Sequence, residues 1–187
     1  MKRVSVVGTV GSGKTMFARA LARRLDVPFI ELDALHWGPD WAEASEAEMR
    51  DRVSQVIAAD AWVIDGNYWR KIGGMVWERA DTVVWLDPPW RTTFLRVLAR
   101  TVRRALRRTE LFNGNRETFQ EAFLSPKSIL LFSIRTGRHR RRIGEERLAR
   151  PEFRRLAVLR LRSPAEAEHW LASVPAASGP ERVTDAS

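Results

Sequence analysis

A glycine-rich segment near the amino terminus constrains this chain more than any other feature. Residues 8–15 read Gly-Thr-Val-Gly-Ser-Gly-Lys-Thr, a complete G-x-x-x-x-G-K-T pattern. The β-branched run at 3–7 predicts a short buried strand before it, and apolar residues at helical spacing predict a helix after it that ends near Leu25. A loop between a strand and a helix N-terminus directs consecutive backbone N–H groups toward phosphate oxygens.

The pattern also gives its two last residues a chemical role. We expect Lys14 to neutralise the β and γ phosphates of a nucleoside triphosphate and Thr15 to offer its hydroxyl to Mg²⁺. The alternative is a glycine-rich turn that carries its lysine by chance, and the strand and helix around it argue against that reading. The sequence therefore predicts a site for ATP and Mg²⁺ that comprises Gly8, Gly11, Ser12, Gly13, Lys14 and Thr15.

Composition limits the class of protein. With 187 residues, 44% of them apolar, we expect one compact domain at 1–172, and the small polar residues at 173–187 predict a disordered tail. The chain has no cysteine, which excludes a disulfide framework, a zinc ribbon and thiolate chemistry. No apolar run approaches the roughly 20 residues of a membrane span, and no export signal is recognisable. We therefore expect a cytoplasmic protein without membrane contact.

Short apolar runs alternate with amphipathic stretches along the whole domain. This alternation predicts a parallel α/β sheet covered by helices on both faces. A capping box at 45–48 opens one helix, which should end near Asp60, and at most one short helix is expected between 64 and 82. The predicted strands are 3–7, 29–32, 62–64, 82–86 and 156–161, and the later helices are 90–108, 125–146 and 163–171.

The basic excess is confined to one part of the chain. The whole sequence carries a formal charge of +9, whereas residues 96–162 hold 19 Lys and Arg against 6 Asp and Glu. Such a segment attracts phosphates, either those of ATP or those of a nucleic acid, although arginines that line solvated helix faces would give the same count. No helix-turn-helix or zinc-finger pattern is present, so a nucleic-acid partner is possible but not favoured.

Four further motifs accompany the phosphate-binding loop. They read Leu-Asp-Ala-Leu-His-Trp at 32–37, Trp-Val-Ile-Asp-Gly-Asn-Tyr at 62–68, Val-Val-Trp-Leu-Asp-Pro-Pro at 83–89 and Leu-Arg-Leu-Arg-Ser at 159–163. The N-K-x-D motif of GTPases is absent, and no clear acidic strand end marks a large motor ATPase. Over about residues 2–171 the chain resembles the adenylate-kinase-like small kinases, and among them the bacterial DNA topology modulation proteins.

This resemblance implies an architecture and an activity. The fold would be a P-loop NTPase three-layer sandwich with a five-stranded parallel sheet in the order 2-3-1-4-5, helices on both faces and an arginine-rich lid at about 100–150. The activity would be transfer of the γ-phosphoryl group of ATP to a small acceptor. A nucleic-acid-associated regulator that uses the basic segment at 96–162 is the alternative. The motifs name no acceptor, and both a monomer and a homodimer stay open.

The resemblance also implies roles on the acceptor side. Asp65 would hold a water bound to Mg²⁺, but Asn-Tyr-Trp at 67–69 replaces the Phe-Pro-Arg of adenylate kinases, so their AMP contact is not carried over. Asp33, expected at the end of the second strand, would accept the proton of an attacking hydroxyl or order the waters of the metal. A carboxylate that only caps a local turn is the alternative for Asp33.

On the lid side the resemblance points to arginines. Arg96 and Arg100 follow Asp87 at spacings of nine and thirteen residues, at which these kinases place phosphate-binding arginines. Arg135 and Arg138 are further catalytic candidates from the lid, and Arg162 would pack against the adenine ring.

Aromatic residues gather in the middle of the chain. Trp37, Trp41 and Trp69 lie in predicted loops on the acceptor side. They could stack on a substrate ring or pack in the core or in the acceptor-binding flap after the second strand, and packing is favoured. Trp62 and Trp85 lie in predicted strands and are expected in the core. His36 is expected to form hydrogen bonds in a loop rather than to bind a metal, because no second histidine or cysteine lies near it.

Overall fold

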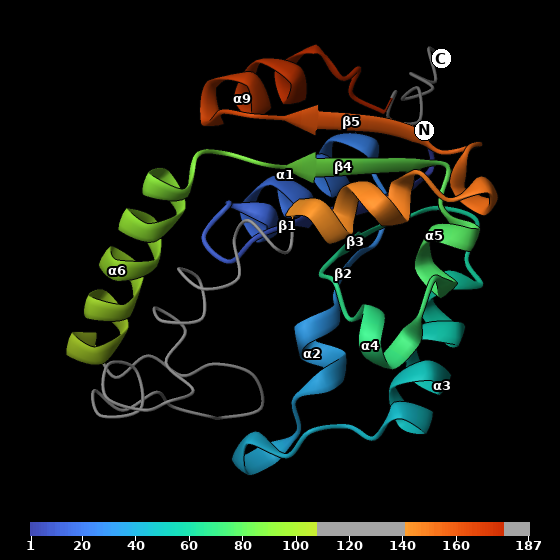
Figure 1. The fold of residues 1–187 in the computed structure, drawn as a ribbon, viewed down its shortest axis with the longest axis horizontal. Helices are drawn as coiled ribbons and strands as arrows, with labels where there is room; N and C mark the ends of the chain where they lie inside the picture. Colours follow the sequence, from blue (N-terminus) through green and yellow to red (C-terminus); the bar gives the residue numbers. More distant parts are fainter. Residues whose placement is uncertain (108–140, 178–187) are drawn as a thin grey trace, which may run out of the picture.

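A five-stranded parallel sheet forms the centre of the molecule (Figure 1). The computed structural model describes residues 1–107 and 141–177, with the backbone alone for 100–107. The strand order is β2-β3-β1-β4-β5, as predicted, and every neighbouring pair is parallel. The strands are β1 (Arg3–Gly8), β2 (Phe29–Glu31), β3 (Trp62–Asp65), β4 (Thr82–Leu86) and β5 (Ala157–Leu161).

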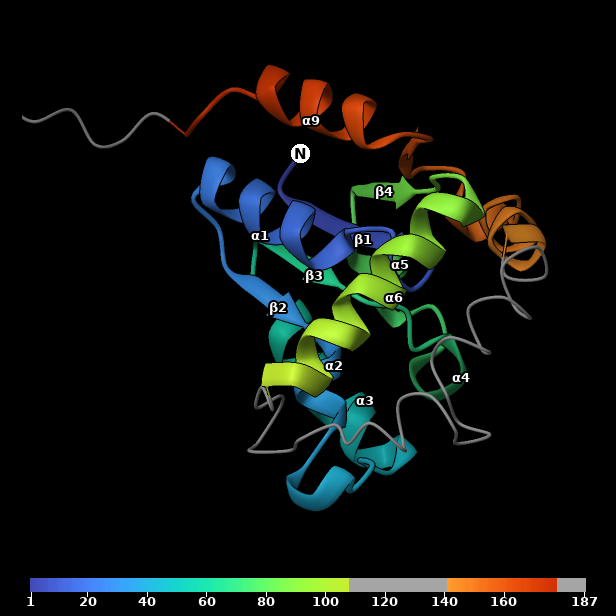
Figure 2. The same ribbon diagram turned by 90° about the vertical axis from the view of Figure 1, so that its left-hand side faces the viewer.

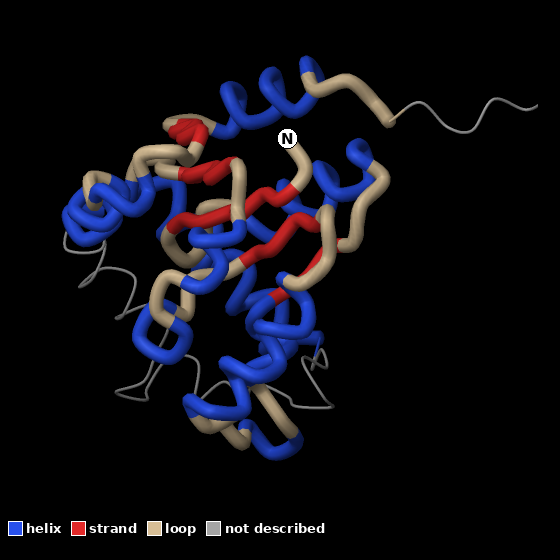
Figure 3. Tube along the Cα trace, turned by 90° about the vertical axis from the view of Figure 1, so that its right-hand side faces the viewer, coloured by secondary structure: helices blue, strands red, loops and turns tan. Residues whose placement is uncertain are grey.

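Helices cover both faces of the sheet and make three layers (Figure 3). Successive strand residues point to opposite faces, so Val4 and Val6 pack into one apolar cluster while Trp62 and Ile64 pack into the other. The first cluster includes residues of α1 (Lys14–Leu25) and α9 (Pro164–Ser173). The second includes residues of α3 (Glu46–Ile57), α4 (Trp69–Ile72), α5 (Met75–Arg79) and a 3₁₀ turn at Pro151–Phe153.

The carboxyl end of the sheet carries the remaining elements. The short helix α2 (Leu32–His36) follows β2 directly, and α6 (Trp90–Arg107) leaves the end of β4, as Figure 2 shows. Residues 141–148 form a further helix beside β4 and β5. None of the described helices is both long and apolar enough to cross a lipid bilayer.

Some local expectations were wrong. Two short helices, α4 and α5, lie between β3 and β4 where at most one was expected, because Gly73 at a φ of 58° ends the first. The strand β2 ends at Glu31, so Asp33 lies in α2 and not at a strand end. A 3₁₀ turn at Pro39–Trp41 occupies part of the predicted loop. The capping box at Ser45 is confirmed, although its helix ends at Ile57, before Asp60.

The start of the predicted tail is packed. The helix α9 continues to Ser173, and Val174 is buried. Arg24 of α1 donates hydrogen bonds to the carbonyls of Ala172 and Val174, and the N–H of Ala177 donates to the carbonyl of Arg24. These contacts hold residues 172–177 against the end of α1, within the first part of the predicted tail.

Candidate active site

The phosphate-binding loop connects β1 to α1 as the sequence predicts. Gly11 has a φ of 79°, and a Cβ atom there would lie 2.5 Å from the carbonyl oxygen of Thr93 in α6. Only glycine fits such a position, for backbone conformation and for space. The tight contact fixes α6 against the loop and places Arg96 beside it.

Two cationic side chains contact this loop. The Lys14 ammonium donates to the carbonyl oxygen of Thr9 at 3.2 Å, and the Arg96 guanidinium donates to that of Ser12 at 3.4 Å. The Ser12 hydroxyl is buried and has no hydrogen-bond partner among the described residues. These donors gather on the loop that the sequence predicts to bind phosphate.

Thr15 and Asp65, the two residues that the sequence predicts to hold the metal, are joined by a hydrogen bond. The Thr15 hydroxyl donates to Asp65 Oδ2 at 2.5 Å, and Asp65 is only 3% exposed. Its Oδ1 is buried without a partner among the described residues. Burial raises the pKa of Asp65, against the effects of Lys14 and of the Thr15 hydrogen bond.

These two oxygens suit Mg²⁺, which prefers hard oxygen ligands. No cluster of three or more acidic, histidine or cysteine side chains suited to a metal occurs in the described part of the chain. Mg²⁺ in phosphate-binding sites is commonly held by one or two protein groups together with phosphate oxygens and water. The residues present therefore fit Mg²⁺ held jointly by protein and nucleotide.

Asp33 lies next to this centre across the end of the sheet. Gly66 follows β3, and a Cβ atom there would lie 2.9 Å from the Cβ of Leu32, so the glycine lets α2 approach the end of β3 closely. The Tyr68 hydroxyl donates to Asp33 Oδ1 at 2.6 Å. The charge of Asp33 raises the pKa of Asp65, which places both carboxylates within one electrostatic environment.

The buried imidazole of His36 packs beside Tyr68, the hydrogen-bond donor to Asp33. His36 is 3% exposed, and its ring centre lies 4.5 Å from that of Trp37 and 4.6 Å from that of Tyr68. Burial lowers the pKa of His36 and nearby Lys71 lowers it further, so its 3.6 Å contact with Glu43 is not an ion pair at neutral pH. His36 thus acts as a packing group between two aromatic rings.

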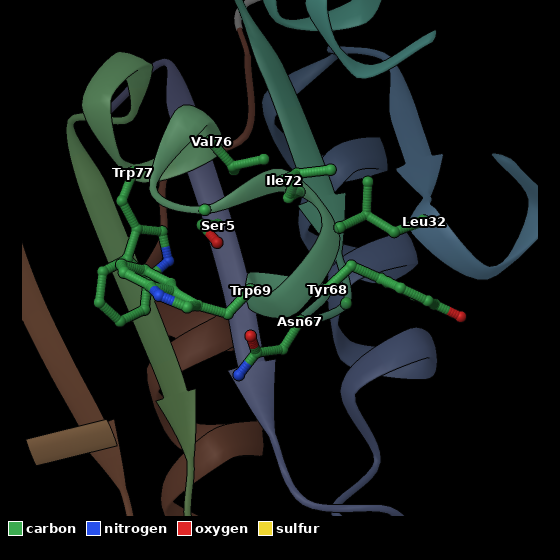
Figure 4. Close-up of a pocket in the computed structure, with 10 residues that line it drawn as sticks. Ser5, Leu32, Asn67, Tyr68, Trp69, Ile72, Val76 and Trp77 are labelled. Atoms are coloured by element: carbon green, nitrogen blue, oxygen red, sulfur yellow. The ribbon is translucent and has the colours of Figure 1, made fainter. Parts of the chain in front are cut away.

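A small pocket opens on the other side of Tyr68 (Figure 4). Its wall is largely apolar and aromatic, and the Tyr68 hydroxyl points away from it. The Trp69 ring packs at 5.1 Å from that of Trp77 and at 5.8 Å from that of Phe153. The lining residues are Ser5, Leu32, Gly66, Asn67, Tyr68, Trp69, Ile72, Gly73, Val76 and Trp77.

The other tryptophans follow the sequence expectation. Trp62 is fully buried and Trp85 nearly so, which confirms both as core residues. The Trp37 and Trp41 rings meet edge to face at 5.5 Å. Trp69 begins α4 and packs against the second apolar cluster, beside Trp77 and Phe153.

Asp87 has a role that the sequence did not reveal. It is 7% exposed, accepts a hydrogen bond from Arg141 at 2.8 Å within an ion pair whose closest contact is 2.7 Å, and accepts two from Arg160 at 2.6 and 2.9 Å. Arg160 also donates to Glu145 at 2.8 Å and covers the Trp85 ring at 4.3 Å. A strand-end aspartate followed by many arginines was the only available signal, and it could not name the partners.

The remaining candidates lie near or beyond the described site. Arg100 lies on α6, and only its backbone is described. Arg135 and Arg138, and most of the expected lid at 100–150, lie outside the described residues. Arg162 is exposed after β5, and its backbone N–H donates to Glu166 at 2.8 Å.

Comparison with known proteins finds sequence similarity over part of the chain. Residues 4–65 match the family model "ATPase family associated with various cellular activities (AAA)", a range that includes the phosphate-binding loop and Asp65. A shikimate kinase of Ruegeria pomeroyi is 37% identical over 108 residues, which cover 45% of this chain and 55% of that protein. The chain thus spans about half the length of this curated relative.

Solved structures resemble the whole domain. Shikimate kinase from Bacteroides thetaiotaomicron superposes with a TM-score of 0.54 at 16% identity, covering 91% of this chain and 94% of that one. For shikimate kinase from Acinetobacter baumannii in complex with shikimate, the TM-score is 0.49 at 15% identity, with 92% and 89% covered. The first likeness and the sheet order together show that the chain has the α/β fold of P-loop NTPases.

Proposed function

We propose that this protein is an ATP-dependent phosphotransferase that moves the γ-phosphoryl group to a hydroxyl of a small acceptor. The observation that carries the proposal is the meeting of two groups at one end of the sheet. Lys14, Thr15 and Asp65 form a phosphate and metal site, and the Asp33 carboxylate lies beside it, held by Tyr68. A partial match to a shikimate kinase supports the same class of reaction.

The residues on the nucleotide side would bind and orient ATP. The loop N–H groups and the Ser12 hydroxyl would bind phosphate oxygens, and Lys14 and Arg96 would offset the charge on the transferred group. Thr15 and Asp65 would hold Mg²⁺, which supplies charge neutralisation at the β and γ phosphates when bound. Phosphate contacts would also come from the lid residues Arg100, Arg135 and Arg138. The adenine ring would pack against Arg162.

On the acceptor side the proposal assigns the proton to Asp33. Transfer to a hydroxyl benefits from a group that accepts the hydroxyl proton, whereas an acceptor phosphate is already anionic and needs none. A half-buried carboxylate with one oxygen held by a neutral donor suits the first case. The finer resemblance to DNA topology modulation proteins rests on the motifs alone and stays a prediction.

The nucleic-acid alternative has less support. In the described part of the basic segment, Arg141 and Arg160 are engaged by Asp87, and Arg142 and Arg150 lie within 4 Å of glutamates. These pairs offset part of the positive charge that a phosphate backbone would require.

A transfer assay tests the proposal. The purified protein is incubated with radiolabelled ATP and Mg²⁺ and with shikimate, small polyols, sugar acids, nucleosides and nucleoside monophosphates. We expect a labelled hydroxyl product with the wild type and with the surface control Lys2→Ala, and none with Lys14→Ala. If the wild type labels no acceptor, or if Lys14→Ala labels as much as the wild type does, the proposal is wrong.

A further inference from the structure

Tyr68 belongs to the motif at 62–68 and stands where this chain departs from adenylate kinases. The segment at 67–69 replaces the Phe-Pro-Arg of adenylate kinases, and its tyrosine makes the hydrogen bond to Asp33. The two residues are 35 positions apart in the sequence, so only the fold brings them together. A substitution in a motif that also creates a short contact with a candidate reactive group calls for a functional explanation.

We infer that Tyr68 is a positioning residue that holds Asp33 Oδ1, so that Asp33 Oδ2 is presented to the acceptor hydroxyl. The inference rests on the proposed function and deepens it. Asp33 belongs to a five-residue helix and its side chain is half-buried, so packing alone leaves its rotamer weakly fixed. A short hydrogen bond to a charged acceptor is among the stronger ways to fix such a group.

The direction of the hydrogen bonds supports this role. The Trp37 side chain hydrogen-bonds to the Tyr68 hydroxyl, and an indole N–H can only donate. The phenol oxygen therefore accepts from Trp37, and its proton is directed to Asp33. Asp33 Oδ2 receives no hydrogen bond within the described residues, so it is the oxygen that stays available.

The surroundings keep Tyr68 in place. Its carbonyl accepts from the N–H groups of Lys71 and Ile72 at 2.8 and 3.0 Å, which fixes its backbone at the start of α4. Its ring packs against His36 at 4.6 Å and forms part of the pocket wall. Burial, and next the charge of Asp33, raises the pKa of Tyr68 well above its usual range, with Glu43 adding to it. The phenol therefore stays protonated and remains a donor.

The transfer moves one phosphoryl group and one proton. The acceptor oxygen forms a bond to the γ-phosphorus while the bond from that phosphorus to the β–γ bridging oxygen breaks, and ADP leaves. The proton of the acceptor hydroxyl passes to Asp33 Oδ2. Tyr68 takes no part in the bond changes and keeps its own proton throughout.

Steady-state kinetics of Tyr68→Phe test the inference with two acceptors, shikimate and water. Transfer to water is measured as phosphate release from ATP. We expect kcat to fall about tenfold, which is part of the rate enhancement that proton transfer to a positioned base supplies. The KM for ATP should stay unchanged. Trp37→Phe removes the donor to the phenol and should lower kcat less. Ser54→Ala removes a hydroxyl on α3 that donates only to the Asp51 carbonyl, and it should leave kcat unchanged.

A double-mutant cycle separates positioning from a structural role. In an Asp33→Asn background, Tyr68→Phe should lower kcat little further, because the carboxylate that Tyr68 positions is already lost. Tyr68 is the only tyrosine in the chain, so 3-fluorotyrosine gives a single ¹⁹F resonance. That resonance should shift in Asp33→Asn and stay unchanged in Ser54→Ala.

The outcomes are distinguishable. Full kcat in Tyr68→Phe, an undiminished defect in the Asp33→Asn background, or a ¹⁹F resonance unaffected by Asp33→Asn would each overturn the positioning role and leave the proposed function standing. A wild type that transfers phosphate to no acceptor, water included, would overturn both.

Discussion

Replacing Asp65 with asparagine should make the protein more stable and at the same time inactive. The change keeps the size and shape of the side chain and removes its charge. Asp65 is 3% exposed, and one of its carboxylate oxygens has no partner among the described residues. Glu31, its register partner on β2, is a second acid whose pKa is raised by burial and then by the charge of Asp65. Removing the charge of Asp65 removes the cost of burying that charge, and it removes the repulsion that contributes to the raised pKa of Glu31.

The sign of the effect follows from the direction in which the pKa moves. Burial raises the pKa of Asp65 from 3.8 despite the opposing effects of Lys14 and Thr15, so the folded protein favours the neutral form, which asparagine mimics. Stabilising single substitutions commonly add about 0.5–2 kcal/mol to the free energy of unfolding. We expect a gain of about 1 kcal/mol, which raises Tm by about 2–4 °C.

The pH dependence has a definite sign. A raised pKa means that the stabilising protonated form is fully present below 3.8 and is lost as the pH rises through the folded-state pKa. The advantage of Asp65→Asn should therefore be greatest at neutral pH and vanish toward pH 3.8.

Thermal unfolding without Mg²⁺ measures the effect, and calorimetric titration measures Mg²⁺·ATP binding, which should be lost in Asp65→Asn. Asp81→Asn is the matched control. Burial acts to raise the pKa of Asp81, but hydrogen bonds from Arg3, Thr82 and Lys2 outweigh it and lower the pKa, so this variant should lose stability. A Tm for Asp65→Asn at or below that of the wild type, at neutral pH without metal, would refute the reasoning.

Three further changes should give measurable results. Asp87→Asn weakens the hold on Arg141 and Arg160, which are partly exposed, and should lower the free energy of unfolding by about 1–3 kcal/mol in urea denaturation. Gly11→Ala forces a Cβ into the α6 backbone and should abolish Mg²⁺·ATP binding in calorimetry, while circular dichroism keeps its helical signal. Burial lowers the pKa of His36 from 6.5, so stability should fall as the pH drops below about 6.5, and His36→Phe should remove that part of the slope in a Tm series.

The sequence was most informative where a property repeats locally along the chain. Apolar runs of strand length and the loop at 8–15 predicted the sheet, its order through the resemblance, and the nucleotide side of the site. Asp65 came from the resemblance, through the Asp-Gly pair at 65–66 that adenylate kinases share, and its role in binding the metal stays a prediction. Such features depend on neighbours in the sequence, which a single chain displays directly.

Contacts between distant residues could not be predicted in the same way. The hydrogen bond between Tyr68 and Asp33 depends on how closely α2 approaches β3. Gly66 permits this close approach, but a glycine at that position does not by itself predict it. The two arginines on Asp87 were hidden among many in the basic segment, since composition does not say which guanidinium meets which carboxylate.

The distribution of charge at the end of the sheet supports a hydroxyl acceptor over a phosphate. Lys14 and Arg96 lie on the loop and on α6, so these two cations are on the nucleotide side, while Arg19 lies 4.0 Å from Glu31 on the other. Glu31, Asp33 and Asp65 lie on the side of β2 and β3, and their mutual repulsion contributes to the raised pKa values of Glu31 and Asp65. An acceptor phosphate on that side would add a further anion to three carboxylates, whereas a hydroxyl can donate to one of them. The carboxylate that raises the pKa of Asp65 would thus also select the acceptor, and Tyr68 would fix the oxygen that does so.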